Sequence, residues 1–325
     1  MQKPKEITIS RFQTLKSKAP VHIPLFNELR DIRDGKYRLE VEKCRDALKS
    51  DDKELYTVLK SKLPCVTFCG LFENGHKAED VHHYNQLMVI DIDKLEPEKV
   101  VKIGEALKND PYVLGLWLSP SGNGFKGLVG TDNSMEQHRE TFDSLRVYFL
   151  DKYETELDGS GSDVSRLCFS SWDPDAHYNN AALPYNEILD FQPAKEKKDR
   201  PLKQVLLSKN AQATEGLNAR KDRELIKKII KYLEKNKRSI TLEYENWVKV
   251  ALAISYTFSY DVGEKYFLEL CRMDGAQHDE GKSEELLKYC YNRRKTGTAK
   301  TISLATIIYL AKQSGFVMNA GKKKA

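Results

Sequence analysis

The sequence predicts a mixed domain of the α/β or α+β class, followed by a smaller all-α domain. Strand-like and helix-like segments alternate before Pro193, whereas the later part of the chain carries only helical patterns. A charged segment that is poor in large apolar residues separates the two parts. With 325 residues, 40% of them hydrophobic, the chain can bury a core in each domain.

Apolar segments in the first part predict the strands of a central sheet. These segments are 63–72, 86–93, 113–120, 125–131 and 165–172. Helical spacing predicts that helices cover the sheet, at 41–63 as one or two helices, at 97–109 and at 135–153.

Everything from Lys221 onward has helical periodicity. In one of these segments the residues that recur at i, i+3 and i+4 spacing predict a core stripe: Trp247, Val250, Ala251, Ile254 and Phe258. Gly315 is expected to end the last helix. The predicted organisation is a domain at 1–193, a linker at 194–220, a helical domain at 221–318 and a basic tail at 319–325.

The two parts differ in charge. From Ala194 onward there are 28 basic and 16 acidic residues, whereas the part before it has 25 basic and 32 acidic residues. A basic half can bind a polyanion such as nucleic acid, but it can also serve only solubility. Charge alone does not separate these two interpretations.

Several function classes are not favoured by the sequence. No stretch reaches the ~20 apolar residues of a membrane helix, and the first residues do not form a signal peptide, so a cytoplasmic location and no membrane partner are expected. The six cysteines show no zinc or disulfide spacing, and we expect them to be buried apolar residues.

The first candidate functional motif is the acidic pair Asp91 and Asp93 in LMVIDID. Side chains alternate along a strand, so both carboxylates should lie on the same face near its exposed end. Such a pair can bind a divalent metal, form a turn, or serve another phosphoryl-transfer chemistry.

The second motif is the glycine loop in SPSGNGFKG, with Ser119, Ser121, Gly122 and Gly124, and with Lys126 just after the glycines. Glycines allow backbone amides to approach phosphate oxygens, and a lysine can neutralise their charge. The same residues are also typical of a plain hairpin turn. The spacing does not fit a Walker A loop.

A third acidic position precedes SRLCF. Asp158 and Asp163 both remain candidates for a third metal ligand, and Arg166 could bind a phosphate. Asp163 could instead cap a turn or pair with Arg166.

The order of these motifs resembles the archaeo-eukaryotic primase (primase-polymerase) superfamily. The segments PVHIPLFNELRDIRDGK, LPCVTFCGLF, MVIDID, LSPSGNGFKGLV and DVSRLCFSSWDPD are similar to its VirE N-terminal-like branch, found on bacterial mobile elements and phages. The likeness covers roughly Arg11 to Pro184. The helical segments from ENWVKVALAI onward resemble a helical primase C-terminal domain.

The resemblance implies an α+β catalytic core with a central, RRM-like, mostly antiparallel sheet. It also implies that Asp91, Asp93 and Asp158 bind Mg²⁺ or Mn²⁺, with Asp163 as the alternative third ligand. The implied nucleotide-binding residues are those of the glycine loop and a downstream arginine: Ser119, Ser121, Gly122, Gly124, Lys126 and Arg166. Lys126 stands where the family at large often has histidine.

The activity implied is template-directed nucleotidyl transfer. Its partners would be single-stranded DNA template and primer, dNTP or NTP substrates, and a replicative helicase encoded separately. The alternative is a nucleic-acid-binding replication accessory protein that keeps the primase fold with weak or no catalysis. A phosphohydrolase that uses the acidic pair as nucleophile and acid is a further alternative.

Overall fold

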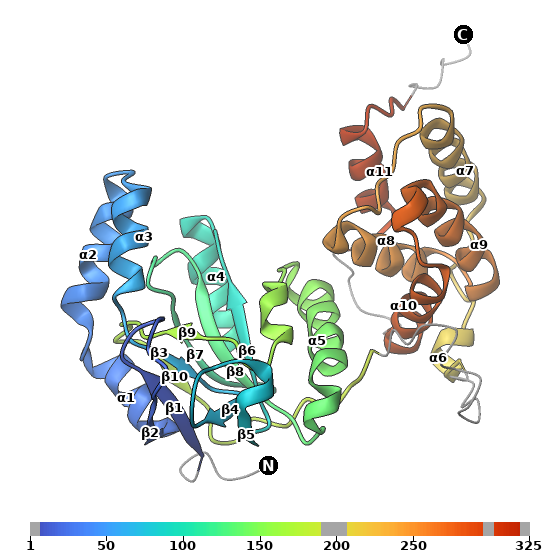
Figure 1. Ribbon diagram of the computed structural model, residues 1–325. Helices are drawn as coiled ribbons and strands as arrows, with labels where there is room; N and C mark the ends of the chain where they lie inside the picture. Colours follow the sequence, from blue (N-terminus) through green and yellow to red (C-terminus); the bar gives the residue numbers. More distant parts are fainter. Residues whose placement is uncertain (1–6, 190–206, 295–301, 319–325) are drawn as a thin grey trace. The chain divides into compact units, whose positions relative to one another are not determined.

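The computed structural model describes most of the chain, namely residues 7–189, 207–294 and 302–318. These residues form an α+β fold with a helical C-terminal region (Figure 1), which confirms the predicted fold class. The predicted linker at 194–220 is described only from residue 207, and the predicted basic tail at 319–325 lies outside the described residues.

The chain divides into two compact units. The first unit comprises Met1–Phe149 and Thr155–Ile188, and the second comprises Leu150–Glu154 and Leu189–Ala325. The end of one long helix is grouped with the second unit.

The first unit holds all the described strands. They are β1 (Thr8–Phe12), β2 (Val21–Pro24), β3 (Cys65–Thr67), β4 (Gly70–Phe72), β5 (Val81–Tyr84), β6 (Leu87–Ile92), β7 (Val113–Leu118), β8 (Phe125–Gly130), β9 (Cys168–Phe169) and β10 (His177–Tyr178). In the described part of the chain they pair antiparallel, in the orders β2-β1-β3-β9, β10-β7-β8-β6 and β4-β5. The predicted strand at 63–72 is thus divided between two of these sheets.

The helices of the first part lie between these strands. They are α1 (Leu25–Asp34), α2 (Arg38–Lys49), α3 (Lys53–Ser61), α4 (Pro97–Lys108) and α5 (His138–Tyr153), with short 3₁₀ helices η1 (Ala78–Asp80), η2 (Met135–Gln137) and η3 (Gly159–Ser162). The segment predicted as one or two helices at 41–63 forms two, α2 and α3, which lie side by side (Figure 1).

Helix α4 packs on one face of the sheet that contains β6 and β8. A Cβ atom on Gly104 would lie 2.8 Å from the Phe125 ring, so the missing side chain allows this close approach. Phe125 pairs with Ile92, and the adjacent pair is Lys126 with Asp91. Because side chains alternate, Asp91 and Lys126 point to the face opposite α4.

The second unit is helical. Its elements are α6 (Lys209–Gln212), α7 (Arg220–Lys235), α8 (Tyr244–Thr257), α9 (Tyr260–Cys271), η5 (Arg272–Gln277), α10 (Glu280–Arg293) and α11 (Leu304–Gln313). Helix α8 packs against α9, α10 and α11. Its predicted stripe is buried except for Trp247, which is half-buried. Gly315 follows α11 with a φ of 92°, as expected for a helix-ending glycine.

Two further expectations concern the whole chain. All six cysteines are free and buried, which confirms their assignment as apolar core residues. Every helix in the described ranges is too short or too polar to span a bilayer.

Candidate metal centre and its surroundings

Asp91 is a buried carboxylate near the end of an otherwise apolar strand. It is 4% exposed, and every residue of β6 is buried. Its Oδ2 atom accepts a hydrogen bond from the ammonium group of Lys126, on the neighbouring strand β8. Its Oδ1 atom is buried and has no hydrogen-bond partner among the described residues. Because an unpaired buried carboxylate oxygen is costly, Oδ1 is suited to bind a cation.

Asp93 is the first residue beyond the end of β6 and is exposed. The pKa of Asp93 is raised, first by partial desolvation of its carboxylate and then by the negative charge of Asp91. This repulsion is expected when two carboxylates share one site. A divalent cation between them would remove it.

Asp158 joins the pair from a distant part of the chain. Its side chain caps η3 by accepting a hydrogen bond from the Ser160 N–H at 2.8 Å. Partial desolvation alone would raise the pKa of Asp158, but the bonds from Ser160 and the charge of Arg166 lower it. The carboxylate is therefore held ionised near Asp91.

The three carboxylates converge. One oxygen from each of Asp91, Asp93 and Asp158 can be chosen so that all three lie within 4.8 Å of one another. Carboxylate oxygens at such separations fit a hard divalent cation such as Mg²⁺ or Mn²⁺. The sequence motifs grouped these three residues, and the fold brings them together.

Asp163, the alternative third ligand, is not part of this group. Its Oδ1 atom accepts hydrogen bonds from the Ser165 N–H at 2.9 Å and from the Ser165 hydroxyl at 2.8 Å. These bonds stabilise a local turn. Of the two candidates for the third ligand, Asp158 lies beside Asp91 and Asp93, whereas Asp163 does not belong to their group.

Two cations face the carboxylates. Lys126 is 6% exposed. Burial alone would lower the pKa of Lys126, but its interactions with Cys168 and Asp91 raise it, so the ammonium group stays charged. Arg166 Nη2 lies 3.8 Å from Asp91 Oδ2 and 4.0 Å from Asp158 Oδ2. Arg166 is partly exposed and can reach a bound anion.

The glycine loop is the hairpin turn between β7 and β8. The Ser119 N–H donates to the Gly124 carbonyl and the Gly122 N–H donates to the Ser119 carbonyl, both at 2.9 Å. These two amides are therefore used inside the turn. The Ser119 hydroxyl lies 2.7 Å from the hydroxyl of Ser121.

Gly124 allows the turn to lie directly against the candidate metal site. A Cβ atom at this position would lie 2.1 Å from the Ile92 carbonyl oxygen and 3.1 Å from the Asp93 Cα atom. Gly122 has a φ of 78°, in the left-handed region that favours glycine. The loop is thus a hairpin turn that lies next to the acidic pair. The sequence offered a hairpin turn and a phosphate-binding loop as interpretations, and this geometry is compatible with both.

Sequence reasoning missed the contribution of α2 and α3. Arg45 donates hydrogen bonds to the carbonyls of Ser119, at 3.2 Å, and Trp172, at 2.8 Å, so α2 holds the turn in place. Tyr56 and Lys60 lie one turn apart on α3. Burial raises the pKa of Tyr56, and the charge of Asp93 adds to this rise. Lys60 is among the cations that oppose the rise in the pKa of Asp93. Nothing in the local sequence of α3 distinguishes these two residues from ordinary helical surface positions.

His138 was missed as well. It is 1% exposed and lies at the start of α5. Its Nε2–H donates to the Gly161 carbonyl at 3.1 Å, which leaves Nδ1 to accept from the Tyr84 hydroxyl at 2.9 Å. Burial lowers the pKa of His138 to about 4. The neutral imidazole therefore anchors η3, the element that directly follows Asp158.

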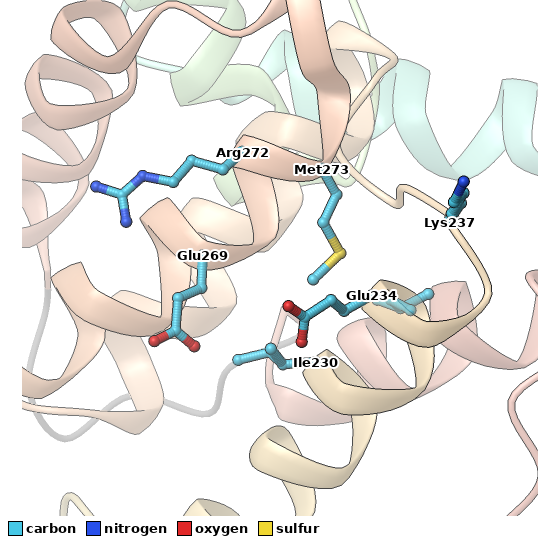
Figure 2. Close-up of a pocket in the computed structure, with 7 residues that line it drawn as sticks. Ile230, Glu234, Lys237, Glu269, Arg272 and Met273 are labelled. Carbon is cyan, nitrogen blue, oxygen red and sulfur yellow. The ribbon is translucent and has the colours of Figure 1, made fainter.

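A cavity of about 600 Å³ lies in the second unit, between α7 and the end of α9 (Figure 2). Its lining combines apolar and charged side chains: Ile230, Leu233, Glu234, Lys237, Glu269, Arg272 and Met273. Arg272 already pairs with Glu280 at 2.6 Å. The cavity contains none of the residues that the sequence motifs identify.

Residues 58–178 match a protein family described as BT4734-like, N-terminal domain. The match covers 121 of 325 residues and includes the three clustered carboxylates, the glycine turn and Arg166. No curated protein and no solved structure gives a significant match to the chain. This segment of the chain is thus similar to the BT4734-like N-terminal domains.

Proposed function

We propose that this chain is a primase-polymerase, a metal-dependent nucleotidyltransferase that adds nucleotides to a strand paired with a single-stranded DNA template. The observation that carries the proposal is the convergence of Asp91, Asp93 and Asp158 within 4.8 Å of one another. The buried, unpartnered Oδ1 atom of Asp91 supports a cation at this position. The order of motifs, which resembles the VirE N-terminal-like branch of the primase superfamily, supports the same assignment.

The acidic group would hold Mg²⁺ or Mn²⁺. When bound, two such ions would activate a 3′-hydroxyl and stabilise the pyrophosphate leaving group. Lys126 would keep the Asp91 carboxylate oriented through their ion pair. Arg166 lies at the edge of the group and would bind the phosphates of the incoming dNTP or NTP.

The turn between β7 and β8 would position the nucleotide. At Gly124 it lies against the backbone of Ile92 and Asp93, so a ligand bound to the carboxylates would lie next to this turn. Arg45 holds the turn in place by a hydrogen bond to the Ser119 carbonyl. A turn held in this way needs little rearrangement when the nucleotide binds.

Helix α7 supplies a surface for the DNA backbone. On the side opposite its buried Ile226, Ile229 and Leu233 it exposes a row of cations: Arg223, Lys227, Lys228, Lys231 and Lys235. No ion pair joins these cations to an acidic side chain within the described ranges. Such a row would bind phosphates without regard to sequence. A cytoplasmic replication role, with a separately encoded helicase, completes the proposal.

The test is to replace Asp91 and Asp93, singly, with asparagine and to assay template-dependent incorporation with Mg²⁺ and with Mn²⁺. We expect both variants to lose synthesis while they keep their fold. Synthesis at the level of the original protein in both variants would eliminate the proposal.

A second candidate is an accessory protein that binds nucleic acid with weak or no catalysis. The ion pair between Lys126 and Asp91 favours it, because the ammonium group occupies a carboxylate oxygen that a metal could use. Titration with Mn²⁺ and nucleoside triphosphate separates the candidates. DNA binding without metal-dependent nucleotide affinity would identify the accessory protein.

A further inference from the structure

Arg45, on α2, touches the glycine turn at two residues. Its Nη2 atom donates a hydrogen bond to the Ser119 carbonyl at 3.2 Å. A Cβ atom on Gly122 would lie 3.2 Å from Arg45 Nε and 3.4 Å from Arg45 Cδ. The end of the arginine side chain therefore lies directly against the backbone of Gly122, where a larger residue would displace it. Helix α2 thus places a cation in contact with the turn.

The guanidinium group of Arg45 is held in one place by neutral groups. Its Nη2 atom also donates to the Trp172 carbonyl at 2.8 Å. Its Cζ atom lies 5.5 Å from the centre of the Trp172 ring. An aromatic face attracts a guanidinium group without neutralising its charge. Two carbonyl acceptors and a ring therefore fix the position of Arg45 and leave its positive charge intact.

No acidic side chain neutralises Arg45. Within the residues that the structure describes, no ion pair joins it to a carboxylate. Two carboxylates act on its charge from farther away, and both are bonded elsewhere. Glu42 pairs with Arg38 at 2.9 Å. Asp173 accepts a hydrogen bond from the Leu118 N–H at 2.8 Å. The charge of Arg45 therefore remains available to an anion.

Two nitrogen atoms of Arg45 have unused hydrogen-bonding capacity. The Nε atom is buried and has no acceptor in the described part of the chain, which is costly for a charged group. The Nη1 atom makes no hydrogen bond to any described residue and is not among the buried atoms, so it can donate to a ligand. A guanidinium group with free donors is well suited to bind phosphate oxygens.

The sheet places Arg45 and the acidic group at neighbouring strand ends. The strand order is β7-β8-β6, with Ser119 directly after β7 and Asp93 directly after β6. Neighbouring strands lie about 4.8 Å apart, so these two ends are separated by about 10 Å. Lys126, on β8 between them, is already bonded to Asp91. A polyphosphate that starts at the metal site and extends along the strand ends toward β7 would thus meet Arg45 as an unpaired cation.

We propose that Arg45 is a phosphate-binding residue of the nucleotide site, with Trp172 as the residue that positions it. The ligand is the terminal phosphate of the incoming nucleoside triphosphate, which Arg45 binds beside the glycine turn. This inference rests on the proposed function, since it needs a nucleotide at the acidic group. It adds α2, a helix outside the acidic and glycine motifs, to the elements that form the site.

The experiment compares Arg45→Gln with the original full-length chain in nucleotide binding. Glutamine removes the charge but keeps an N–H donor for one of the two carbonyls. Affinities for deoxyadenosine triphosphate and monophosphate are measured with Mn²⁺ and without DNA. We expect Arg45→Gln to weaken triphosphate binding by about tenfold or more and to change monophosphate binding little. Arg45→Lys, which keeps the charge, should retain most of the preference for the triphosphate.

Arg38→Gln is the matched control. Arg38 lies on the same helix, and its Cζ atom is 4.6 Å from the centre of the same Trp172 ring, but it is exposed and pairs with Glu42. The control removes the same charge and should leave both affinities unchanged. An equal loss of triphosphate affinity in Arg38→Gln and Arg45→Gln would assign the effect to net charge and overturn the inference.

The comparison of the two nucleotides separates phosphate binding from support of the turn. A residue that only supports the turn would affect the triphosphate and the monophosphate alike. Equal losses for both nucleotides in Arg45→Gln would therefore overturn the inference. Thermal unfolding checks that each variant is folded. If only Arg45→Lys folds, it still decides, because loss of its preference for the triphosphate would also overturn the inference.

The remaining contrary results differ in scope. If the original protein binds the triphosphate and Arg45→Gln binds it equally well, the inference fails while the proposed function stands. The inference fails in the same way if the variant loses affinity only for single-stranded DNA. If the original protein binds no triphosphate with Mn²⁺, the proposed function fails as well.

Discussion

The backbone N–H of Asp158 donates a hydrogen bond to the carbonyl oxygen of Asp91 at 2.9 Å. These residues are far apart in the sequence, yet this bond joins the start of η3 to strand β6. The third carboxylate is therefore positioned by backbone as well as by its own capping bond to Ser160. The geometry of the candidate metal site therefore depends on this contact between η3 and β6.

The first prediction separates the two candidates for the third ligand. Asp158→Asn should abolish metal-dependent nucleotide incorporation, since it removes one of the three converging carboxylates. Asp163→Asn should retain it, because the Asp163 side chain lies outside the carboxylate group and accepts hydrogen bonds from Ser165 in a local turn. Incorporation assays with Mn²⁺, with circular dichroism to check folding, measure both. The reverse pattern would transfer the ligand role to Asp163.

The second prediction concerns the glycine turn. Gly124→Ala should displace the turn from the end of β6, because the added Cβ atom would meet the Ile92 carbonyl at 2.1 Å. We expect loss of triphosphate binding together with a drop in the melting temperature. Gly281→Ala is the control, since its nearest contact would be 3.4 Å away. Normal nucleotide binding in Gly124→Ala would show that the turn does not position the ligand.

The third prediction is a pH dependence of stability caused by His138. Its folded-state pKa of about 4 lies below the usual value of 6.5, so between these values the unfolded chain binds a proton that the native protein does not. The stabilising contribution of neutral His138 to the free energy of unfolding is thus complete above pH 6.5 and is lost as the pH falls toward 4. The expected loss is about 3 kcal/mol.

Urea unfolding at several pH values between 4 and 7 measures this effect. His138→Gln should show a flatter pH dependence, and His83→Gln, on an exposed position of β5, should keep the original one. An unchanged slope in His138→Gln would refute the assignment.

The fourth prediction tests the α7 surface in DNA binding. The variant replaces four exposed cations of α7 with glutamine: Lys227, Lys228, Lys231 and Lys235. It should bind single-stranded DNA more weakly, and its binding should depend less on salt concentration. Each lost phosphate contact should reduce the slope of log K against log salt by about 0.7. Fluorescence anisotropy at several salt concentrations measures this slope.

A matched control removes the same charge from other exposed lysines of the chain: Lys43, Lys62, Lys99 and Lys102. If both quadruple variants lose affinity equally, net charge rather than the α7 surface binds the DNA.

The fifth prediction concerns the buried pair of Lys126 and Asp91. Lys126→Met should destabilise the protein by about 3 kcal/mol, because the buried Asp91 carboxylate loses its hydrogen-bonded ammonium group and keeps only the more distant Arg166, at 3.8 Å. Mn²⁺ should restore part of this stability if Asp91 is a metal ligand. Thermal unfolding with and without Mn²⁺ tests this. The double variant with Asp91→Asn should lose the metal response, and equal rescue in both variants would contradict the metal assignment.

Much of the candidate site could be predicted because its signals are local. An apolar run that ends in alternating carboxylates defines a strand and the face on which Asp91 lies, since side-chain alternation is a property of the backbone. Glycines between two apolar segments define the hairpin turn at residues 119–124 for a similar reason. The buried stripe of α8 follows from helical periodicity alone.

Other parts could not be predicted because they depend on which distant segments meet. The residues themselves left Asp158 and Asp163 both as candidates, and the structure separates them: Asp158 joins Asp91 and Asp93 and bonds to the Asp91 carbonyl, whereas the Asp163 side chain bonds to Ser165. The segment 63–72 contains one apolar run, yet its two halves pair with different strands, which no local pattern specifies.

By itself, the sequence determined that a mixed domain of helices and strands precedes a helical C-terminal region, because both follow from short-range spacing. The resemblance to the primase superfamily added the α+β class and the choice of Asp158 as third ligand. The tertiary structure alone decided which carboxylates converge, that Lys126 pairs with Asp91, and that Arg45 of α2 bonds to the glycine turn. These relationships arise from packing between elements distant in the chain. The free energy of such contacts depends on burial and partner geometry, which residue order does not encode locally.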